Sequence, residues 1–400
     1  MTRRLPPTAP GNLRLEARLA QEARQEAERG LVRRCPPIED RHGMRYRLDG
    51  REVVSFCSND YLGIAGEALS LDQGGAKRRS EPGKSAVAGC RTITAGTAAS
   101  RLVCGDLPEH RALERRFASF IGMEDAVLFP SGFQANASVP ASLLRPGDAV
   151  YSDVLNHASL IDGLRLSPGE RKIIEHLQRP QDPDGWWFCE SVFSMDGDGP
   201  AIAALEAHLA EGGKLYLDEA HALGLYTGGR GRAASLTREP TVLIAPLGKA
   251  MGCAGAFVCA SRLVCDWIRG HARGFVFSTG VSPVLVQTID AALDRIAGRE
   301  GDERRAALWR KVERFRARLS AGGIALDGHL PHPIHPILIG PNERASSSSA
   351  RLLERGWHVQ AIRPPTVPEG SARLRVTLSA AHEDAEIDGF ADDLIQELKR

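Results

Sequence analysis

The sequence predicts an α/β protein whose main sheet is largely parallel and covered by helices on both faces. From about residue 108 onwards, short apolar strands alternate with helical segments, which is the pattern of a parallel sheet. The chain has 400 residues. Single cores usually stop growing before this length, so we expect a second, smaller domain. The composition, with 42% hydrophobic and 25% charged residues, is that of an ordinary globular protein.

Net charge, cysteine usage and hydropathy narrow the class of protein. There are 51 basic and 50 acidic residues, so no overall field favours nucleic acid or a membrane surface. The eight cysteines have no spacing typical of zinc ligands, so we expect free thiols, a reducing cytoplasm and no metal site. The basic N-terminus lacks the apolar core of a signal peptide, and no run reaches the roughly 18 apolar residues that span a bilayer.

The first 64 residues are predicted to form an N-terminal helix and hairpin segment. Leucine and alanine alternate with glutamate and arginine at helical spacing over 12–34, which predicts an amphipathic helix. Short strands over 46–48 and 53–56 flank Asp49-Gly50, a typical hairpin turn. Residues 65–90 are polar and rich in glycine, serine and lysine, and we expect a loop there.

Residues 65–300 are predicted to form the large domain. Its strands are expected over 126–129, 149–151, 187–190, 215–217, 242–244 and 254–260, and its helices over 110–121, 133–144 and 201–210. The segment 163–166 fits either a helix or the start of a loop. A charged helix over 303–321, short strands and a closing helix over 383–399 predict a smaller α+β domain over 301–400.

Polar residues follow several of these strands. In a parallel sheet, chemistry collects beyond the carboxyl ends of the strands. The residues expected at that edge are Ser131, His157, Ser194, Asp218, His221 and Lys249.

Lys249 suits a covalent cofactor anchor. It lies between Gly248 and Gly252, after an apolar strand. Glycine lets a planar group approach the backbone and lets the chain turn beside it. A lysine enclosed by apolar surface has a lowered pKa, which imine formation with an aldehyde requires. The alternative interpretation is an ordinary loop lysine.

Three further residues suit a ring-shaped cofactor. Asp218 ends a strand and can pair with a protonated ring nitrogen, although it can equally cap a helix. His221 can donate to a ring oxygen, and His157 can stack its imidazole on an aromatic ring. Each histidine can instead be a structural, partly buried residue.

Two other patterns suit anionic groups. Gly132 and Phe133 open a helix directly after Ser131, and free N–H groups at a helix start bind phosphate. Arg373 and Arg375 alternate on a late strand, so both point to one face, and one of them can clamp a carboxylate. A plain turn and a solvated surface strand are the alternatives. Together with the lysine, these features match the needs of pyridoxal phosphate acting on an amino acid.

Seven motifs carry a resemblance to a known family. The chain resembles the α-oxoamine synthases over nearly its whole length. The resemblance implies a fold-type I pyridoxal phosphate-dependent transferase, with a mainly parallel seven-stranded sheet in the large domain and a smaller C-terminal α+β domain. The motifs cover residues 58–63, 105–113, 129–136, 156–159, 190–198, 218–221 and 247–252.

The resemblance assigns roles to individual residues. Lys249 is implied as the imine-forming lysine, Asp218 as the partner of the ring nitrogen, and His221 as the donor to the ring oxygen. The remaining implied cofactor contacts are His157, Gly132, Phe133 and Ser194. The implied substrate contacts are Asn59, Thr366 and Arg375, with Arg373 still possible, and Arg33 or Arg34. Ser278 and Thr279 match a segment that reaches the partner subunit's phosphate, which implies a homodimer with shared active sites.

The resemblance also indicates the reaction. Residues 361–370 and 372–382 look most like members that condense L-alanine with a pimeloyl thioester in biotin synthesis. Residues 152–166 look equally like members that join glycine to acetyl-CoA, and a condensing enzyme of secondary metabolism is a further alternative. The acyl carrier, coenzyme A or acyl carrier protein, stays open.

The chain departs from the family pattern at three places. Pro246 stands where the family usually has a phosphate-binding threonine, and Val32 stands near an expected arginine. Residues 65–90 do not follow the helical sequence pattern that is usual in the family. Three other functions share some of these features: an aminotransferase of the same fold, a non-catalytic partner subunit, and an acyl-carrier-binding module. The motif at 58–63 argues against the first. Lys249 argues against the second, and the joint presence of His157, Asp218 and His221 argues against the third.

Overall fold

The structure is a computed structural model, and it describes residues 10–32, 35–67, 94–326 and 330–400. Two earlier expectations lie outside these ranges. They are the roles of Arg33 and Arg34, and most of the loop expected over 65–90.

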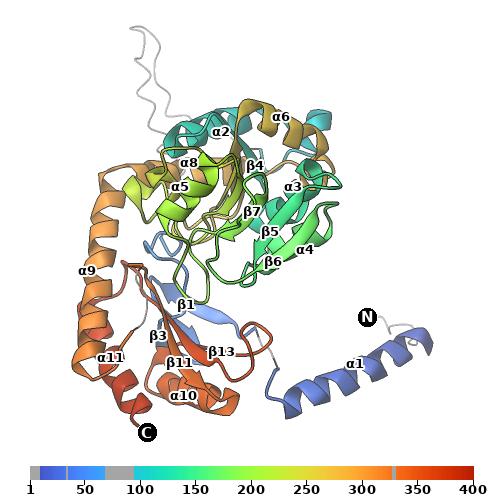
Figure 1. Cartoon of the computed structure of the whole chain (residues 1–400). Coiled ribbons are helices and arrows are strands. Elements are labelled where there is room, and N and C mark those ends of the chain that lie inside the picture. The colour runs from blue at the N-terminus through green and yellow to red at the C-terminus, as the bar shows by residue number, and fades with distance from the viewer. Residues whose placement is uncertain (1–9, 33–34, 68–93, 327–329) are drawn as a thin grey trace, which may run out of the picture.

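A seven-stranded sheet forms the centre of the large part of the molecule (Figure 1). The strand order is β4-β10-β9-β8-β7-β5-β6. Neighbouring pairs from β9 to β6 are parallel, whereas β10 is antiparallel to both β9 and β4. This confirms the predicted mainly parallel sheet. The strands are β4 (Asp125–Phe129), β5 (Ala149–Asp153), β6 (Glu170–Ile174), β7 (Trp186–Glu190), β8 (Lys214–Asp218), β9 (Val242–Pro246) and β10 (Ala256–Ala260).

Strand β6 was missed because it lacks the apolar signal of its neighbours. It lies at the edge of the sheet, and its first four residues are exposed. An edge strand with one free side does not need a continuous apolar sequence, and charged residues there protect the edge.

The two faces of the sheet are covered by two separate hydrophobic clusters. Leu128 packs into one cluster, while its strand neighbours Val127 and Phe129 pack into the other, as alternation along a strand requires. The covering helices are α2 (Pro108–Ile121), α3 (Gly132–Leu143), α4 (Ala158–Arg165), α5 (Ile202–Ala210), α6 (Arg262–His271), α7 (Arg273–Val276) and α8 (Pro283–Ala297). Residues 163–165 therefore belong to a helix, which decides the interpretation that the sequence left open.

Two smaller sheets lie in the other part of the molecule. One has the order β1-β2-β3-β12 and the other the order β11-β14-β13. The predicted hairpin around Asp49-Gly50 is confirmed by the pairing of β2 with β3. The strands are β1 (Ile38–His42), β2 (Arg45–Leu48), β3 (Arg51–Ser55), β11 (Ile334–Gly340), β12 (Trp357–His358), β13 (Gln360–Ile362) and β14 (Ala372–Thr377).

Segments from both ends of the chain share the first of these sheets, because β3 pairs with β12 in parallel. Helix α10 (Asn342–Glu354) packs on this region. The long α9 (Arg299–Ala321) runs from the large part to the small part beside α11 (Asp384–Leu398), as Figure 1 shows. Arg314 binds Asp388 of α11 through two hydrogen bonds of 2.8 and 2.6 Å. The proposed division of the chain at residues 64 and 300 stays a prediction.

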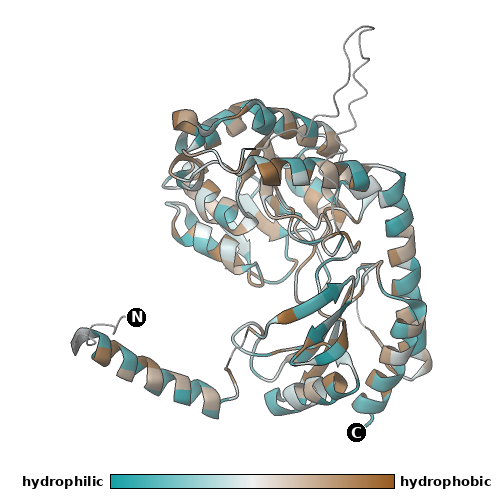
Figure 2. Cartoon of the chain, turned by 180° about the vertical axis from the view of Figure 1, so that it is seen from behind, coloured by the Kyte–Doolittle hydropathy of each residue, from teal (hydrophilic) through white to brown (hydrophobic). Residues whose placement is uncertain are grey.

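Helix α1 (Pro10–Glu28) stands away from the rest of the chain (Figures 1 and 2). Leu13, Leu15 and Leu19 are 54%, 47% and 48% exposed. The helix ends at Glu28, earlier than the predicted limit of residue 34. In the described ranges, no helix has both the length and the hydropathy needed to cross a membrane.

Phe56 provides a test of how the two ends of the chain are held together. It is fully buried and stacks on Phe390 of α11 with ring centroids 3.9 Å apart. Phe56→Ala should lower the free energy of unfolding by about 3–5 kcal/mol, because a large cavity is left in the core. Urea denaturation measures the loss. Leu263→Ala, at a position that is 80% exposed, is the control and should change the stability by less than about 0.5 kcal/mol. A loss below about 1 kcal/mol for Phe56→Ala would contradict the role of the stack.

Candidate active site

The carboxyl ends of β5, β7, β8 and β9 bring the predicted residues to one edge of the sheet. Glu190 ends β7 and lies opposite Asp218, which ends β8. Asp218 in turn lies opposite Ile244 of β9, and Lys249 follows in the turn between β9 and β10. His157 follows β5 and precedes α4.

Lys249 is half-buried, and its side chain makes no hydrogen bond or ion pair within the described parts of the chain. Burial lowers its pKa, the carboxyl groups of Asp218 and Glu190 oppose this shift, and Arg375 adds to it. A lower pKa increases the fraction of neutral amine, which is the form that attacks an aldehyde or accepts a proton. Gly252 has φ +66°, and a Cβ there would lie 2.7 Å from the backbone N of Ala65, so this turn requires glycine.

Asp218 is buried and its orientation is fixed by hydrogen bonds. The amide Nδ2 of Asn136 donates to Oδ2 at 2.7 Å, and the backbone N–H of Ala220 donates to Oδ1 at 2.9 Å. Tyr216 donates to Oδ1 of Asn136 at 3.1 Å, which sets the amide orientation. No helix begins within the turns that follow Asp218, so the alternative interpretation as a helix cap does not apply.

His157 caps α4 with its ring. The backbone N–H of Ser159 donates to Nδ1 at 3.2 Å, so the proton of the neutral ring lies on Nε2. The ring is exposed at the edge of the sheet, which leaves a face available for stacking. Surrounding protein atoms still desolvate the ring enough to lower the pKa of His157. The charge of Asp218 acts to raise this pKa, and the charge of Lys249 acts to lower it. The ring of Phe133 packs edge-on against it, with centroids 6.5 Å apart.

Glu190 was not predicted as a site residue. It is buried, and its Oε1 accepts a hydrogen bond of 2.7 Å from the backbone N–H of His157. Burial raises its pKa well above the ordinary value, and the neighbouring charge of Asp218 adds to this. Glu190, like Asp218, is an acidic residue at the end of an apolar strand. The pattern that predicted Asp218 could therefore have predicted Glu190 as well.

His221 is buried near Asp218 and Lys249. Its Nδ1 lies 2.7 Å from the hydroxyl of Tyr61. Burial lowers its pKa well below the ordinary value, and the positive charge of Lys249 is the next largest cause. The ring is therefore neutral and carries one proton. Within the described residues, its Nε2 has no hydrogen-bond partner.

The start of α3 fits a phosphate group. Ser131 caps the helix by accepting a hydrogen bond of 3.2 Å from the N–H of Gln134. A Cβ at Gly132 would lie 2.7 Å from Cγ of Pro246, so only glycine fits between the helix and β9. The N–H groups of Gly132 and Phe133, in the first turn of a 12-residue helix, have no intrahelical acceptor. Pro246 itself offers no hydroxyl and no N–H.

The two arginines of β14 have different partners. Arg375 is buried, and its Nε donates to the carbonyl oxygen of Ser194 at 2.6 Å while Nη1 donates to Oδ1 of Asn59 at 3.1 Å. Arg373 instead forms an ion pair with Asp196. Arg375 thus joins the Lys249 cluster, whereas the charge of Arg373 is neutralised beside it.

Three predicted residues lie outside this cluster. Thr279 pairs with Ser100 in an isolated bridge, and the hydroxyl of Ser278 lies 3.5 Å from the carbonyl oxygen of Thr279. No hydrogen bond joins either residue to Lys249 or Asp218 within the described ranges. Thr366 is exposed in the connection between β13 and β14.

The assembled residues fit pyridoxal phosphate. A lysine of lowered pKa without a hydrogen-bond partner suits its aldehyde, and the glycine-restricted start of α3 suits its phosphate. The buried carboxylate of Asp218 suits a ring nitrogen, and the open imidazole of His157 suits a ring face. In the described parts of the chain, no group of acidic, histidine or cysteine residues is placed to hold a metal ion.

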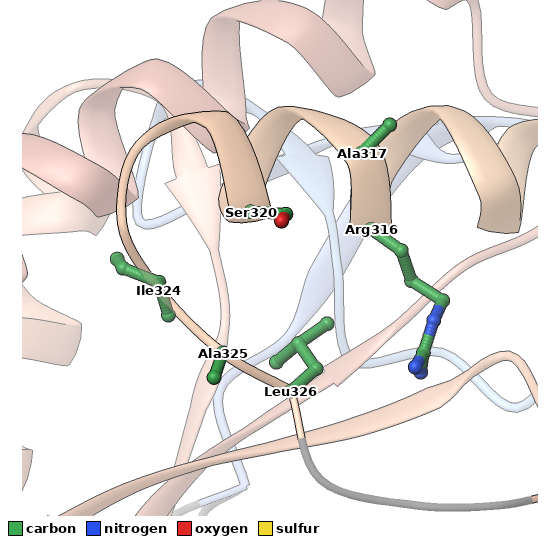
Figure 3. A pocket seen from close by; sticks show the side chains of 6 residues that line it. All are labelled: Arg316, Ala317, Ser320, Ile324, Ala325 and Leu326. Carbon is green, nitrogen blue, oxygen red and sulfur yellow. The ribbon is translucent and has the colours of Figure 1, made fainter.

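Two cavities lie apart from this site, along α9. One, of about 420 Å³, lies between the end of α9 and residues 324–326 and is open to solvent (Figure 3). The other, of about 530 Å³, is lined in part by Tyr226 and Trp309. Neither cavity is lined by any predicted site residue.

Comparisons with known proteins identify relatives of this chain. The family model of class I and class II aminotransferases matches residues 51–394. An 8-amino-7-oxononanoate synthase of Anaeromyxobacter dehalogenans is 41% identical over 376 residues, which is 90% of each chain.

Solved structures share the fold. The 8-amino-7-oxononanoate synthase of Francisella tularensis superposes with a TM-score of 0.70 and 24% identity, covering 87% of this chain and 98% of that one. A serine palmitoyltransferase of S. paucimobilis with bound PLP has a TM-score of 0.81 and 22% identity, covering 95% and 96%.

His176 ties together two loops of the site and gives a test of their stability. Its Nδ1 lies 3.0 Å from Asp153, which also holds the loop before His157, and its Nε2 lies 3.1 Å from Asp198, in the loop after Ser194. Hydrogen bonds to the two carboxylates raise the pKa of His176 to about 10, against burial.

The imidazolium stabilises the folded chain most at a pH below its unfolded pKa of about 6.5, and this contribution is lost as the pH rises through about 10. His176→Gln should therefore lower the free energy of unfolding by about 2 kcal/mol at pH 6, with a smaller loss at pH 10. Denaturation at both pH values measures this, and His42→Gln, on an exposed strand, is the control. An equal loss at both pH values would show that the ring acts without its charge.

Proposed function

Because this chain belongs to the α-oxoamine synthases, within the class I and class II aminotransferase family, we propose that it condenses L-alanine with a pimeloyl thioester. The products are 8-amino-7-oxononanoate, carbon dioxide and the free thiol, as in biotin synthesis. The observation that carries this proposal is the 41% identity over 90% of the chain to a relative named for that product. Pyridoxal phosphate is the cofactor.

When bound, the cofactor supplies an aldehyde that takes up the amino acid and a ring that withdraws electrons from its α-carbon. We assign the reactions at the α-carbon to Lys249, whose lowered pKa makes it a base. It accepts the α-proton, and general base catalysis of this kind contributes about 10²–10⁴ to the rate. Asp218, fixed by Asn136 and Ala220, supplies the negative charge that keeps a ring nitrogen protonated.

Arg375 is proposed to hold the carboxylate of the amino acid. Its Nε and Nη1 are already bound to Ser194 and Asn59, which fixes the guanidinium plane. Nη2 makes no hydrogen bond within the described residues, and we assign it to the substrate. A fixed planar donor orients the bond to the departing carboxylate better than a flexible ammonium group. Arg373 is not proposed for this role, because Asp196 neutralises it.

His157 is proposed to assist at the thioester. The α-carbon attacks the thioester carbonyl, the bond to sulfur breaks, and the thiol leaves with a proton. Because Ser159 fixes Nδ1 as an acceptor, Nε2–H is the available donor toward the oxygen that becomes negative in this step. The carboxyl group of the amino acid then leaves as carbon dioxide, and a proton replaces it at the α-carbon.

A homodimer with shared active sites is part of the same proposal. Val103 and Phe277 are 78% and 72% exposed, and Phe277 lies directly before Ser278 and Thr279. Exposed apolar side chains that cluster beside a proposed phosphate-contacting segment suit a subunit interface. Helix α1, with its exposed leucines, can pack on the partner. We further propose a cytoplasmic location, since the cysteines of the described ranges are free thiols.

A substrate matrix tests the reaction. L-alanine, glycine and L-serine are each combined with pimeloyl, acetyl and palmitoyl thioesters, and thiol release is measured. L-alanine with the pimeloyl thioester should give the highest kcat/KM, at least about tenfold above the other pairs. Lys249→Ala is the blank and should lose at least about 100-fold of the activity. Lys172→Ala, in exposed strand β6, is the matched control. A preference for glycine with acetyl-CoA would assign a different α-oxoamine synthase activity.

Subunit mixing tests the shared site. Thr279→Glu places a negative charge where the partner's phosphate is proposed to bind, and should abolish activity by repelling the cofactor. Mixing the inactive Thr279→Glu and Lys249→Ala chains under conditions of subunit exchange should restore thiol release, because each heterodimer regains one intact site. Co-purification of an untagged chain with a tagged one confirms exchange, and sedimentation shows that the exchanged species is a dimer. No recovery in exchanged dimers would place Thr279 outside the partner's site.

A further inference from the structure

Tyr61 is a buried side chain of the site to which no role has yet been assigned. It is fully buried, and its hydroxyl lies within hydrogen-bonding distance of two side chains. Nδ1 of His221 lies at 2.7 Å and Oδ1 of Asn59 at 3.2 Å. Burial raises the pKa of Tyr61 to about 12, although the nearby Arg375 guanidinium acts to lower it, so the phenol keeps its proton at neutral pH.

The protons in this arrangement can be counted. The phenol has one proton to donate, and Oδ1 of Asn59 can only accept. Asn59 also accepts a hydrogen bond of 3.1 Å from Arg375, so its oxygen keeps one donor when the Tyr61 proton points to His221 instead. His221 is neutral, so its single proton lies on either Nδ1 or Nε2. If Tyr61 donates to Nδ1, which is the closer neighbour, the proton of His221 lies on Nε2.

The backbone of His221 is held separately from its ring. Nδ1 of His332 accepts a hydrogen bond of 3.0 Å from the N–H of Ile334, so its Nε2 carries the proton and donates to the carbonyl oxygen of His221 at 2.9 Å. His332 therefore fixes the backbone of His221. Within the described residues, the hydroxyl of Tyr61 is the hydrogen-bonding partner of the His221 ring, and it can determine which of the two neutral tautomers the ring adopts.

We propose that Tyr61 is a positioning residue that donates to Nδ1 of His221 and thereby keeps Nε2–H of that ring available to the cofactor oxygen. This inference rests on the proposed pyridoxal phosphate site. Through Asn59 the same hydroxyl is also in contact with the arginine proposed to bind the substrate carboxylate.

Tyr61→Phe tests the proposal, because it removes the hydroxyl and keeps the buried ring. A donor to the cofactor oxygen stabilises its anionic form. Losing the donor should therefore raise, by about one unit, the pH at which the absorption of the bound cofactor changes in the absence of substrates. The value of kcat should fall about tenfold, with little change in KM for the amino acid. The absorption titration does not depend on which thioester the enzyme uses, so it separates this inference from the proposed substrates.

Tyr46→Phe is the matched control. Tyr46 is also buried, its hydroxyl lies 2.5 Å from Nδ1 of His358, and its pKa is likewise raised to about 12. It should lower the thermal midpoint of unfolding as Tyr61→Phe does, with no shift in the absorption titration. A shift of the same size in both variants, or in neither, would overturn the proposal.

A double-mutant cycle gives a second test. If Tyr61 acts through the ring of His221, Tyr61→Phe should have no further effect on the absorption titration or on kcat in the His221→Asn enzyme. Additive effects of the two substitutions would show that Tyr61 acts independently of His221, and would also overturn the proposal.

Discussion

The site depends on placing two carboxyl groups side by side at the ends of buried parallel strands. Glu190 and Asp218 are paired in register and buried, so a negative charge on both at once is unfavourable, and burial together with the charge of Asp218 raises the pKa of Glu190. Each is held by hydrogen bonds from backbone N–H groups, and the two carboxyl groups together offset the desolvation of Lys249. The strand register that places Glu190 beside Asp218 therefore also places negative charge near the buried side chain of Lys249.

Hydrogen bonds from these strand ends extend into the loops that carry the remaining groups. Glu190 holds the backbone of His157, while Asp153 and Asp198 are joined through His176. Since neither loop is regular structure, its position depends on such side-chain contacts rather than on strand pairing. This explains how an exposed histidine can keep one orientation, with Ser159 fixing its tautomer. Positioning by charged contacts also makes the loop geometry dependent on pH.

The small sheets complete the site from the other side. Arg375 comes from β14. It donates to Ser194, in the loop that follows β7, and to Asn59, in the segment after β3. Tyr61 joins this group to His221. Arg375, which is proposed to bind the substrate carboxylate, and the residues proposed to bind the cofactor thus come from different sheets. They meet because β14 and the segment after β3 pack against the ends of the large sheet. A condensing enzyme needs this arrangement, because the amino acid must contact both.

The sequence by itself determined the class of fold and the positions of most strands, and it predicted Lys249, Asp218, His157 and His221 as candidate site residues. These follow from local patterns: apolar runs, glycine turns and polar residues at strand ends. Only the tertiary structure decided that Arg373 pairs with Asp196 while Arg375 joins Asn59, because alternation on a strand places both on the same face. It also revealed Glu190 and Tyr61 as members of the site. Their contacts link residues far apart in the chain, and such contacts are set by packing and register, which local sequence does not encode.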